Sequence, residues 1–278
     1  MNTFQNKVAA ITGAGSGIGQ QLALRLAEQG CHLALSDINQ QGLTATLDLI
    51  KGLNVHVTTQ MLDVADRVAM YAWAEQVVQQ HGQVHMIFNN AGVALASTVE
   101  GASYEELEWI VGINFWGVVY GSKAFLPYLK QSGDGHIINL SSLFGLTAQP
   151  TQSAYNATKF AVRGFTESLA QELQLENCGV SALCVHPGGI RTNIANAARV
   201  NASLAVQNPE DATSDFNEFL RMPAQQAADE ILQAVLKNKR RVLIGRDAKL
   251  LDLIQRLFPA GYQQLMVWAI RWRERSKR

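Results

Sequence analysis

The chain has 278 residues, of which 47% are hydrophobic and 17% charged, a globular composition that excludes intrinsic disorder. The 23 Lys and Arg residues balance the 23 Asp and Glu residues, so no overall field attracts nucleic acid. Cys31, Cys178 and Cys184 lack metal-binding or CxxC spacing, which favours free thiols. Since neither a signal peptide nor an apolar run of about 18 residues is present, we expect one soluble, cytoplasmic domain.

Short β-rich runs alternate with longer helical patterns along the chain. Several of the β-rich runs are continuously apolar, as expected for strands covered on both faces, and the alternation predicts a doubly wound parallel sheet of seven strands with helices on both faces. The expected strands are 7–12, 32–37, 54–62, 84–89, 136–141, 180–186 and 241–245. The expected helices are 17–29, 39–52, 65–81, 103–131, 153–176 and 223–238.

Two segments depart from this alternation. Residues 189–222 form a long polar insertion, and such excursions often serve as lids or binding loops. Residues 246–278 form a tail with two helical stretches separated at Pro259, and the tail ends in RWRERSKR. Basic residues beside Trp272 can mark a membrane-surface helix. Because the apolar stretch is short and interrupted, we instead expect the tail to lie on the protein and to help wall an apolar pocket.

The first expected strand runs into TGAGSGIG, from Thr12 to Gly19. Its glycines permit a tight turn and let backbone N–H groups approach a pyrophosphate at the N-terminus of the next helix, where the helix dipole favours anions. A strand before the motif and a helix after it are the context it requires. We therefore expect a Rossmann-type fold, with cofactor contacts from Gly13, Ser16, Gly17, Ile18 and Gly19.

Asp37 ends the second expected strand. About 20 residues beyond such a loop, a carboxylate accepts hydrogen bonds from the adenosine ribose hydroxyls. The same charge repels a 2′-phosphate, and neither Ile38 nor Asn39 supplies a compensating cation. The sequence thus favours NAD over NADP. Asp37 could in parallel be the N-cap of the next helix.

The segment YNATK places Tyr155 and Lys159 one helical turn apart. Free tyrosine titrates near pH 10, but an adjacent positive charge stabilises the phenolate and lowers this pKa. Tyr155 could then exchange a proton with an alcohol or a ketone at neutral pH. The alternative is a half-buried tyrosine beside a solvated lysine, and these five residues alone do not decide between the two.

The remaining motifs are NNAG (89–92), INFWG (113–117), INLSS (138–142) and HPGGIRT (186–192). Together with TGAGSGIG and YNATK, they occur in the order and spacing of the short-chain dehydrogenase/reductase family. The chain resembles the single-domain branch of that family over residues 5–245, and the combination is specific although each motif alone is not. The resemblance implies the catalytic residues Asn114, Ser142, Tyr155 and Lys159.

In that family pattern, Ser142 would polarise the substrate carbonyl and stabilise a developing alkoxide. Ser141 is chemically identical, but successive strand side chains point to opposite faces, and the family's spacing of thirteen residues before Tyr155 selects Ser142. Asn114 would hold a water that links Lys159 to bulk solvent. Strand-end caps are the alternative role for the serines, and a hydrogen bond to backbone is the alternative for Asn114.

The resemblance also implies cofactor contacts beyond the glycine loop. Asn90 would bind near the adenine ring, and Asp63 would border it unless it only caps the following helix. Ile190 and Thr192 would meet the nicotinamide carboxamide. The full set implied outside the loop is Asp37, Asp63, Val64, Asn90, Tyr155, Lys159, Pro187, Gly188, Ile190 and Thr192, and no metal site is expected.

The expected function is that of an NAD-dependent oxidoreductase that interconverts a secondary alcohol, preferably a lipophilic one, and a ketone. A catalytically silent dinucleotide-sensing regulator is the main alternative, but such proteins typically lack part of the catalytic tetrad. An epimerase or dehydratase and a membrane-surface adaptor are weaker alternatives. By resemblance, helices 103–131 and 153–176 would pair across a two-fold axis, so a homodimer or homotetramer is expected.

Overall fold

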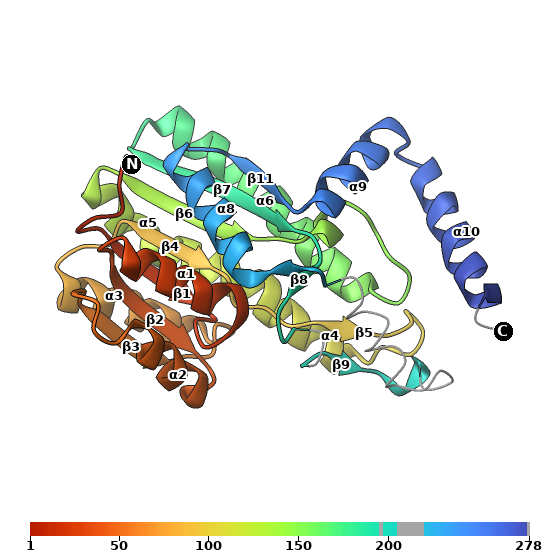
Figure 1. Ribbon diagram of the computed structural model, residues 1–278, viewed down its shortest axis with the longest axis horizontal. Coiled ribbons are helices and arrows are strands. Elements are labelled where there is room, and N and C mark those ends of the chain that lie inside the picture. Colours follow the sequence, from red (N-terminus) through yellow and green to blue (C-terminus); the bar gives the residue numbers. More distant parts are fainter. Residues whose placement is uncertain (195–196, 205–219, 277–278) are drawn as a thin grey trace.

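The computed structural model describes residues 1–194, 197–204 and 220–276. Seven strands form one sheet in the order β11-β7-β6-β4-β1-β2-β3, and all of its pairings are parallel (Figure 1). The predicted doubly wound sheet is therefore confirmed. Its strands are β1 (Val8–Thr12), β2 (His32–Asp37), β3 (Val57–Met61), β4 (Met86–Asn89), β6 (Gly135–Leu140), β7 (Val180–Pro187) and β11 (Arg241–Ile244).

The strand order reverses between β1 and β4. From β1 the chain builds outward through β2 to β3, and it then returns to place β4 on the other side of β1. In open α/β sheets, ligands bind in the crevice beyond the carboxyl ends of the strands at such a switch point. The glycine-rich segment follows β1 and the NNAG segment overlaps the end of β4, so both lie at this crevice.

Helices cover both faces of the sheet, and this explains the continuously apolar strands. Ala9 and Ile11 of β1 belong to one core layer, whereas Val8 and Ala10 belong to the other. The first layer contains residues of α1 (Gly17–Glu28), α2 (Gln40–Ile50) and α8 (Ala224–Leu236). The second contains residues of α3 (Arg67–His81), α5 (Gly117–Ser132) and α6 (Ser153–Glu176).

The helix expected over 103–131 is interrupted. α4 (Tyr104–Val111) begins with a capping box between Ser103 and Glu106 and runs into a π-helical turn, Gly112–Trp116, before α5. The apolar pattern continues through the turn, so periodicity gave no sign of the interruption. π-turns are frequent at functional sites, and this one carries Asn114. The strand expected over 54–62 is also shorter than predicted, since β3 spans five residues.

The two ends of the polar insertion after β7 pair with each other, since β8 (Ile190–Arg191) pairs with β10 (Met222–Pro223). Between these ends, β9 (Arg199–Val200) pairs with β5 (Leu95–Ala96), which follows β4. The described part of the insertion therefore borders the crevice. Residues 195–196 and 205–219 of the predicted binding loop lie outside the described residues.

The tail forms α9 (Arg246–Leu257) and α10 (Gly261–Ser276). α9 is fastened to the body because the buried Asp252 pairs with Arg241 of β11 at 2.5 Å. α10 begins against the body with the buried Tyr262 and then projects away from it (Figure 1). The expectation that the tail lies on the protein thus holds for α9 and the start of α10 only. Among the described helices, none has both the length and the apolar character of a membrane span.

Candidate active site

The glycine-rich loop has the shape that a dinucleotide requires. Gly13 and Gly17 have φ of 64° and 55°, in the left-handed region that favours glycine. A Cβ on Gly19 would overlap the Gly13 carbonyl oxygen and the side-chain amide of Asn90. Ser16 is the N-cap residue of α1 and its side chain makes no capping hydrogen bond, so the first-turn N–H groups, with Ile18 among them, are available to a phosphate.

Asp37 is bonded to this loop. Its carboxylate accepts hydrogen bonds from the Gly15 N–H at 2.8 Å and the Asn39 N–H at 2.9 Å. The N-cap of α2 is Asn39, whose side chain accepts from the Gly42 N–H at 3.1 Å. The proposed N-cap role of Asp37 is therefore wrong, because Asn39 occupies that position. Asp37 instead ties the end of β2 to the phosphate loop.

The Asn90 side chain also serves the loop. Its amide nitrogen donates to the Thr12 carbonyl at 2.9 Å and to the Gly13 carbonyl at 3.1 Å. The Thr12 hydroxyl in turn accepts from the backbone N–H groups of Asn90 and Ala91. These bonds join the carboxyl ends of β1 and β4, so the Asn90 amide faces the glycine loop in this structure rather than open solvent.

Asp63 and Val64 lie at the neighbouring strand end. Asp63 is exposed and accepts from the Ala65 N–H at 2.9 Å. The cap of α3 is Asp66, not Asp63, since the Asp66 side chain accepts from the Ala69 N–H. Val64 is buried and packs against Gly117, where any larger side chain would strike it.

The two adjacent serines after β6 face different partners. The Ser141 hydroxyl donates to the backbone carbonyl of Lys159 at 2.8 Å and is buried. The half-buried Ser142 hydroxyl hydrogen-bonds Tyr155, which lowers the Tyr155 pKa, and accepts from the Phe144 N–H at 3.1 Å. The serine selected by the family spacing is thus the one that faces the tyrosine.

Tyr155 and Lys159 are both buried on α6. Burial raises the pKa of Tyr155, and the Ser142 hydrogen bond only partly offsets this. Burial also lowers the pKa of Lys159 to about 8, and its ammonium donates to the Leu140 carbonyl at 3.0 Å. The prediction that the Tyr155 pKa is lowered is therefore not met, because desolvation of the phenolate by burial is the largest influence on this pKa and raises it.

Asn114 lies beside this pair, but its side chain is committed to backbone. Its oxygen accepts from the Val93 N–H at 2.8 Å, and its nitrogen donates to the Val93 carbonyl at 2.9 Å and to the Thr158 hydroxyl at 3.3 Å. This is the backbone-bonded role considered as an alternative. A Cβ on Gly92 would stand 3.2 Å from the Asn114 oxygen and 3.4 Å from the Lys159 ammonium nitrogen. The side chains of Asn114 and Lys159 therefore both approach Gly92.

The turn after β7 closes the site from the other side. Pro187 ends β7, and the Gly188 N–H donates to the Ile244 carbonyl at 2.9 Å. Ile190 is buried, whereas the Thr192 methyl group lies against Gly17 of the phosphate loop. The predicted nicotinamide-contacting turn and the predicted pyrophosphate loop therefore meet.

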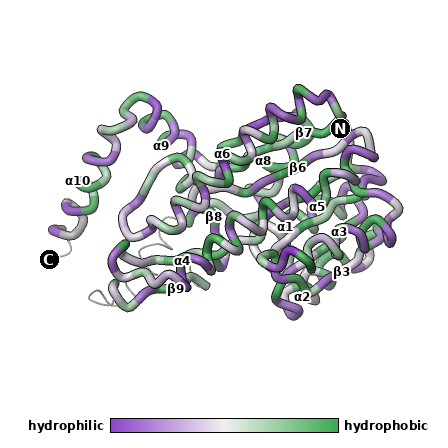
Figure 2. The backbone as a smooth tube through the Cα atoms, turned by 180° about the vertical axis from the view of Figure 1, so that it is seen from behind, coloured by the Kyte–Doolittle hydropathy of each residue, from purple (hydrophilic) through white to green (hydrophobic). Residues whose placement is uncertain are grey.

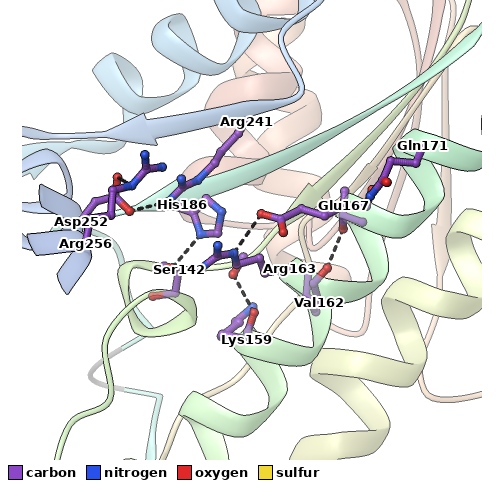
Figure 3. A network of polar contacts seen from close by, with 12 residues as sticks. Ser142, Lys159, Val162, Arg163, Glu167, Gln171, His186, Arg241, Asp252 and Arg256 are labelled. Atoms are coloured by element: carbon purple, nitrogen blue, oxygen red, sulfur yellow. Dashed lines mark hydrogen bonds and ion pairs between the residues drawn. The ribbon is translucent and has the colours of Figure 1, made fainter. Parts of the chain in front are cut away.

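Sequence reasoning missed three residues that support the site. The buried His186 donates from Nδ1 to the Ser142 carbonyl at 3.1 Å (Figure 3). Asp247 accepts from the Gly189 N–H at 2.6 Å, and the Tyr262 hydroxyl accepts from the Ala148 N–H at 3.1 Å. His186 stands directly before Pro187 in a motif that was already singled out, so it could have been found. Asp247 and Tyr262 lie in the tail, and no local pattern connects them to the site.

A phosphate-binding loop on β1, a carboxylate on β2 and a Ser–Tyr–Lys group at the carboxyl edge of the same sheet define a dinucleotide-dependent oxidoreductase. A protein-family model, described as short chain dehydrogenase, matches residues 7–202 of the chain. The chain belongs to the short-chain dehydrogenase family.

Individual relatives agree with this assignment. SadH of Mycobacterium tuberculosis (strain ATCC 25618 / H37Rv), which is named an oxidoreductase, is 47% identical over 96% of each chain. Estradiol 17-beta-dehydrogenase 11 of Pongo abelii is 29% identical over 92% of this chain and 80% of its own length. A crystal structure of a short-chain dehydrogenase/reductase from Burkholderia phymatum in complex with NAD superposes with a TM-score of 0.85 at 29% identity, and the match covers 93% of this chain and 95% of that one.

Proposed function

We propose that the protein is an NAD-dependent oxidoreductase that interconverts a lipophilic secondary alcohol and its ketone, with Tyr155 as the proton donor and acceptor. The observation that carries the proposal is the surroundings of Tyr155. Its hydroxyl bonds Ser142, while its ring belongs to an apolar cluster with Leu95 and Ile110 and meets Phe144 edge-on at 6.0 Å. A polar reacting group is thus set in an apolar wall, which suits a carbonyl on an apolar skeleton.

The residues present fit a bound dinucleotide. Gly13, Gly17 and Gly19 leave room for the pyrophosphate at the N-terminus of α1, and Asp37 offers its carboxylate to the adenosine ribose. The absence of a cation at Ile38 and Asn39 supports NAD rather than NADP, and the NAD complex of the Burkholderia relative points the same way. When bound, NAD would accept the hydride during alcohol oxidation and NADH would return it during ketone reduction.

The protein's own groups would handle the proton. Because the pKa of Tyr155 is raised, its phenol is protonated at neutral pH and can donate to a ketone oxygen as the alcohol forms. The Ser142 hydroxyl would donate to the same oxygen and stabilise its developing charge. In the reverse direction Tyr155 must first release its own proton to solvent, and the ammonium of Lys159 would stabilise the resulting phenolate, which would then accept the alcohol proton.

The remaining site residues would support these groups. His186 holds the backbone at Ser142, and we assign Asn114 to positioning, since its side chain fastens Val93 beside Lys159. The lipophilic character of the substrate agrees with the name of the relative Estradiol 17-beta-dehydrogenase 11. The described residues of the insertion, together with the tail residues that bond Gly189 and Ala148, would help determine which alcohol is accepted.

The proposal is tested by following NADH absorbance. Purified protein is incubated with NAD and secondary alcohols of increasing chain length, and with NADH and the matching ketones. We expect kcat/KM to rise with chain length and to vanish in Tyr155→Phe. If the protein binds NAD but turns over none of these compounds, it is the silent dinucleotide-sensing regulator considered above.

A further inference from the structure

The two tail helices expose an unusual amount of apolar surface. Of the twenty large hydrophobic side chains that are exposed in the described part of the chain, nine fall between residues 250 and 272. They are Leu250, Leu253, Leu257, Phe258, Leu265, Val267, Trp268, Ile270 and Trp272. Scattered exposed apolar residues are normal, whereas a contiguous group marks an interaction site.

The orientation of α9 is the reverse of an ordinary surface helix. Its body-facing side carries Ala248 and Asp252, both buried, and Asp252 pairs with Arg241 and Arg256. Leu250, Leu253 and Leu257 follow one another at i, i+3 and i+7, so they share one face, and each is more than half exposed. Three of the four leucines of α9 therefore point to solvent, whereas the half-buried Leu251 does not, and the buried Asp252 points inward.

α10 continues this arrangement away from the body. Leu265 and Trp268 are three residues apart and are 52% and 63% exposed. Figures 1 and 2 show the helix leaving the rest of the chain, with hydrophobic and hydrophilic residues alternating along it. A helix with this much apolar surface normally packs against something.

Charge is segregated onto the same segment. Residues 246–278 contain eight of the 23 Lys and Arg residues but only three of the 23 Asp and Glu residues, which gives the tail a net charge of +5 and residues 1–245 a net charge of −5. Two of the three tail acids, Asp247 and Asp252, are bonded to the body. Exposed cations, which are Arg246, Lys249, Arg256, Arg271 and Arg275, therefore border the apolar side chains.

We propose that α9 and α10 form a docking surface for an anionic lipid bilayer, called here the tail surface and defined by Leu250, Leu253, Leu257, Leu265 and Trp268. Leucine and tryptophan bordered by arginine and lysine are the composition of helices that lie in the membrane interface, and the positive tail complements negatively charged lipid headgroups. The helices would lie on the membrane and not cross it. The proposal does not depend on which substrate the enzyme takes.

Docking would place the site close to the membrane. α9 binds the turn after β7 through Asp247, and α10 binds the segment between Ser142 and Tyr155 through Tyr262. The two helices that carry the tail surface are thus hydrogen-bonded to two segments that flank the catalytic residues, at Gly189 and at Ala148. An apolar alcohol or ketone dissolved in the bilayer would then reach the crevice without crossing water.

Co-sedimentation of the full chain with lipid vesicles tests the proposal. We expect binding to vesicles of equimolar phosphatidylcholine and phosphatidylglycerol that is at least about tenfold stronger than to phosphatidylcholine alone and that weakens with added salt. Leu257→Glu combined with Trp268→Glu should abolish the binding. Leu175→Glu combined with Val68→Glu, at side chains that are 88% and 74% exposed on α6 and α3, adds the same two charges away from the tail. This matched control should bind as the wild type does.

Light scattering and NAD affinity complete the test. Both variants should keep the wild-type mass and NAD affinity, which shows that they fold. The proposal is overturned if the wild type stays in the supernatant with anionic vesicles, or if the double variant still sediments with them. If the wild type does not bind vesicles and the double variant has a lower mass than the wild type, the tail surface binds a second copy of the chain.

Discussion

The ammonium nitrogen of Lys159 lies 5.6 Å from the centre of the Tyr155 ring and is held there by the carbonyl oxygen of Leu140. Leu140 ends β6, two residues before Ser142. The strand that presents the serine therefore also fixes the lysine beside the tyrosine. This geometry brings the three groups together, and each of them can be tested separately.

Tyr155→Phe should reduce turnover by several orders of magnitude while leaving NAD affinity and thermal stability near wild type. Only the hydroxyl that exchanges the proton is removed, and the ring keeps its apolar contacts with Phe144. Steady-state kinetics and NAD titration of the same preparation measure both effects. A general acid contributes a factor of about 10²–10⁴ to the rate. If turnover of the variant stays within about tenfold of wild type, another group transfers the proton.

Replacement of Lys159 should change the pH dependence of stability. The unfolded chain keeps the lysine proton up to pH 10.5, whereas the folded chain releases it near pH 8, so the unfolded state binds more protons between these values and stability rises with pH there. Relative to Lys159→Met, the wild type should gain up to about 3 kcal/mol from pH 8 to 10.5. Denaturant unfolding across this range measures the gain, and parallel curves for the two proteins would contradict it.

Asp37 has two separable tasks, and two substitutions distinguish them. Asp37→Ala removes both the charge that repels a 2′-phosphate and the acceptor for the Gly15 N–H. It should narrow the preference for NAD over NADP and weaken the binding of both cofactors. Asp37→Asn keeps an acceptor, so it should narrow the preference with a smaller loss of affinity. Equal wild-type kcat/KM with NAD and NADP would refute the electrostatic argument.

The histidines should make the fold sensitive to acid. Burial lowers the pKa of His85 and His186 to about 4 from 6.5, so the unfolded chain takes up these protons first and stability falls as the pH drops from 6.5 to 4. His85→Asn can still accept from the Val8 N–H, as Nδ1 of His85 does at 3.1 Å. In this variant the free energy of unfolding should fall with decreasing pH less steeply than in the wild type, by about 1 kcal/mol per pH unit. An unchanged slope in denaturant unfolding would exclude His85 as a source.

Oligomerisation is expected through α5 and α6. Trp116, the last residue of the π-turn before α5, and Phe160 of α6 remain 44% and 39% exposed. Trp116 stacks on Tyr120 of α5 with ring centres 5.6 Å apart, so apolar side chains stay exposed at the start of α5 and on α6. Trp116→Glu with Phe160→Glu should lower the mass measured by light scattering. A monomeric wild type at micromolar concentration would contradict the prediction directly.

The parts of the fold that could be predicted from the sequence are those with local signals. The strands follow from continuous apolar runs, and the contact between the phosphate loop and α1 follows from the spacing of Gly13, Gly17 and Gly19. The π-turn around Asn114 could not be predicted, because an extra residue shifts the phase of the helix but the apolar residues Ile113, Phe115 and Trp116 within the turn hide that shift. The exposure of α10 was missed for another reason, since an amphipathic pattern does not say what covers the apolar face.

The site residues likewise divide into those that the sequence predicts and those that it does not. The family's spacing pointed to Ser142, and the structure turns its hydroxyl toward Tyr155. The direction of the Tyr155 pKa was wrong, because sequence spacing reveals the neighbouring charge of Lys159 but not the depth of burial. The Tyr262 contact was out of reach because its partner, Ala148, is 114 residues away. Contacts between residues so far apart in the sequence depend on how the whole chain packs.

Gly145 lies where the segment after β6 crosses α6, and a Cβ there would stand 2.7 Å from the carbonyl oxygen of Lys159 and overlap the Ser141 hydroxyl. The Ser141 hydroxyl donates to the same carbonyl. The segment after β6 can therefore approach α6 this closely only because residue 145 has no side chain. The proton-transfer chemistry is therefore held by a rigid junction that takes no part in choosing the substrate. An engineer could vary residues 189–222 to accept new alcohols while leaving the junction untouched, whereas a single alanine at position 145 would misalign the chemistry for every substrate at once.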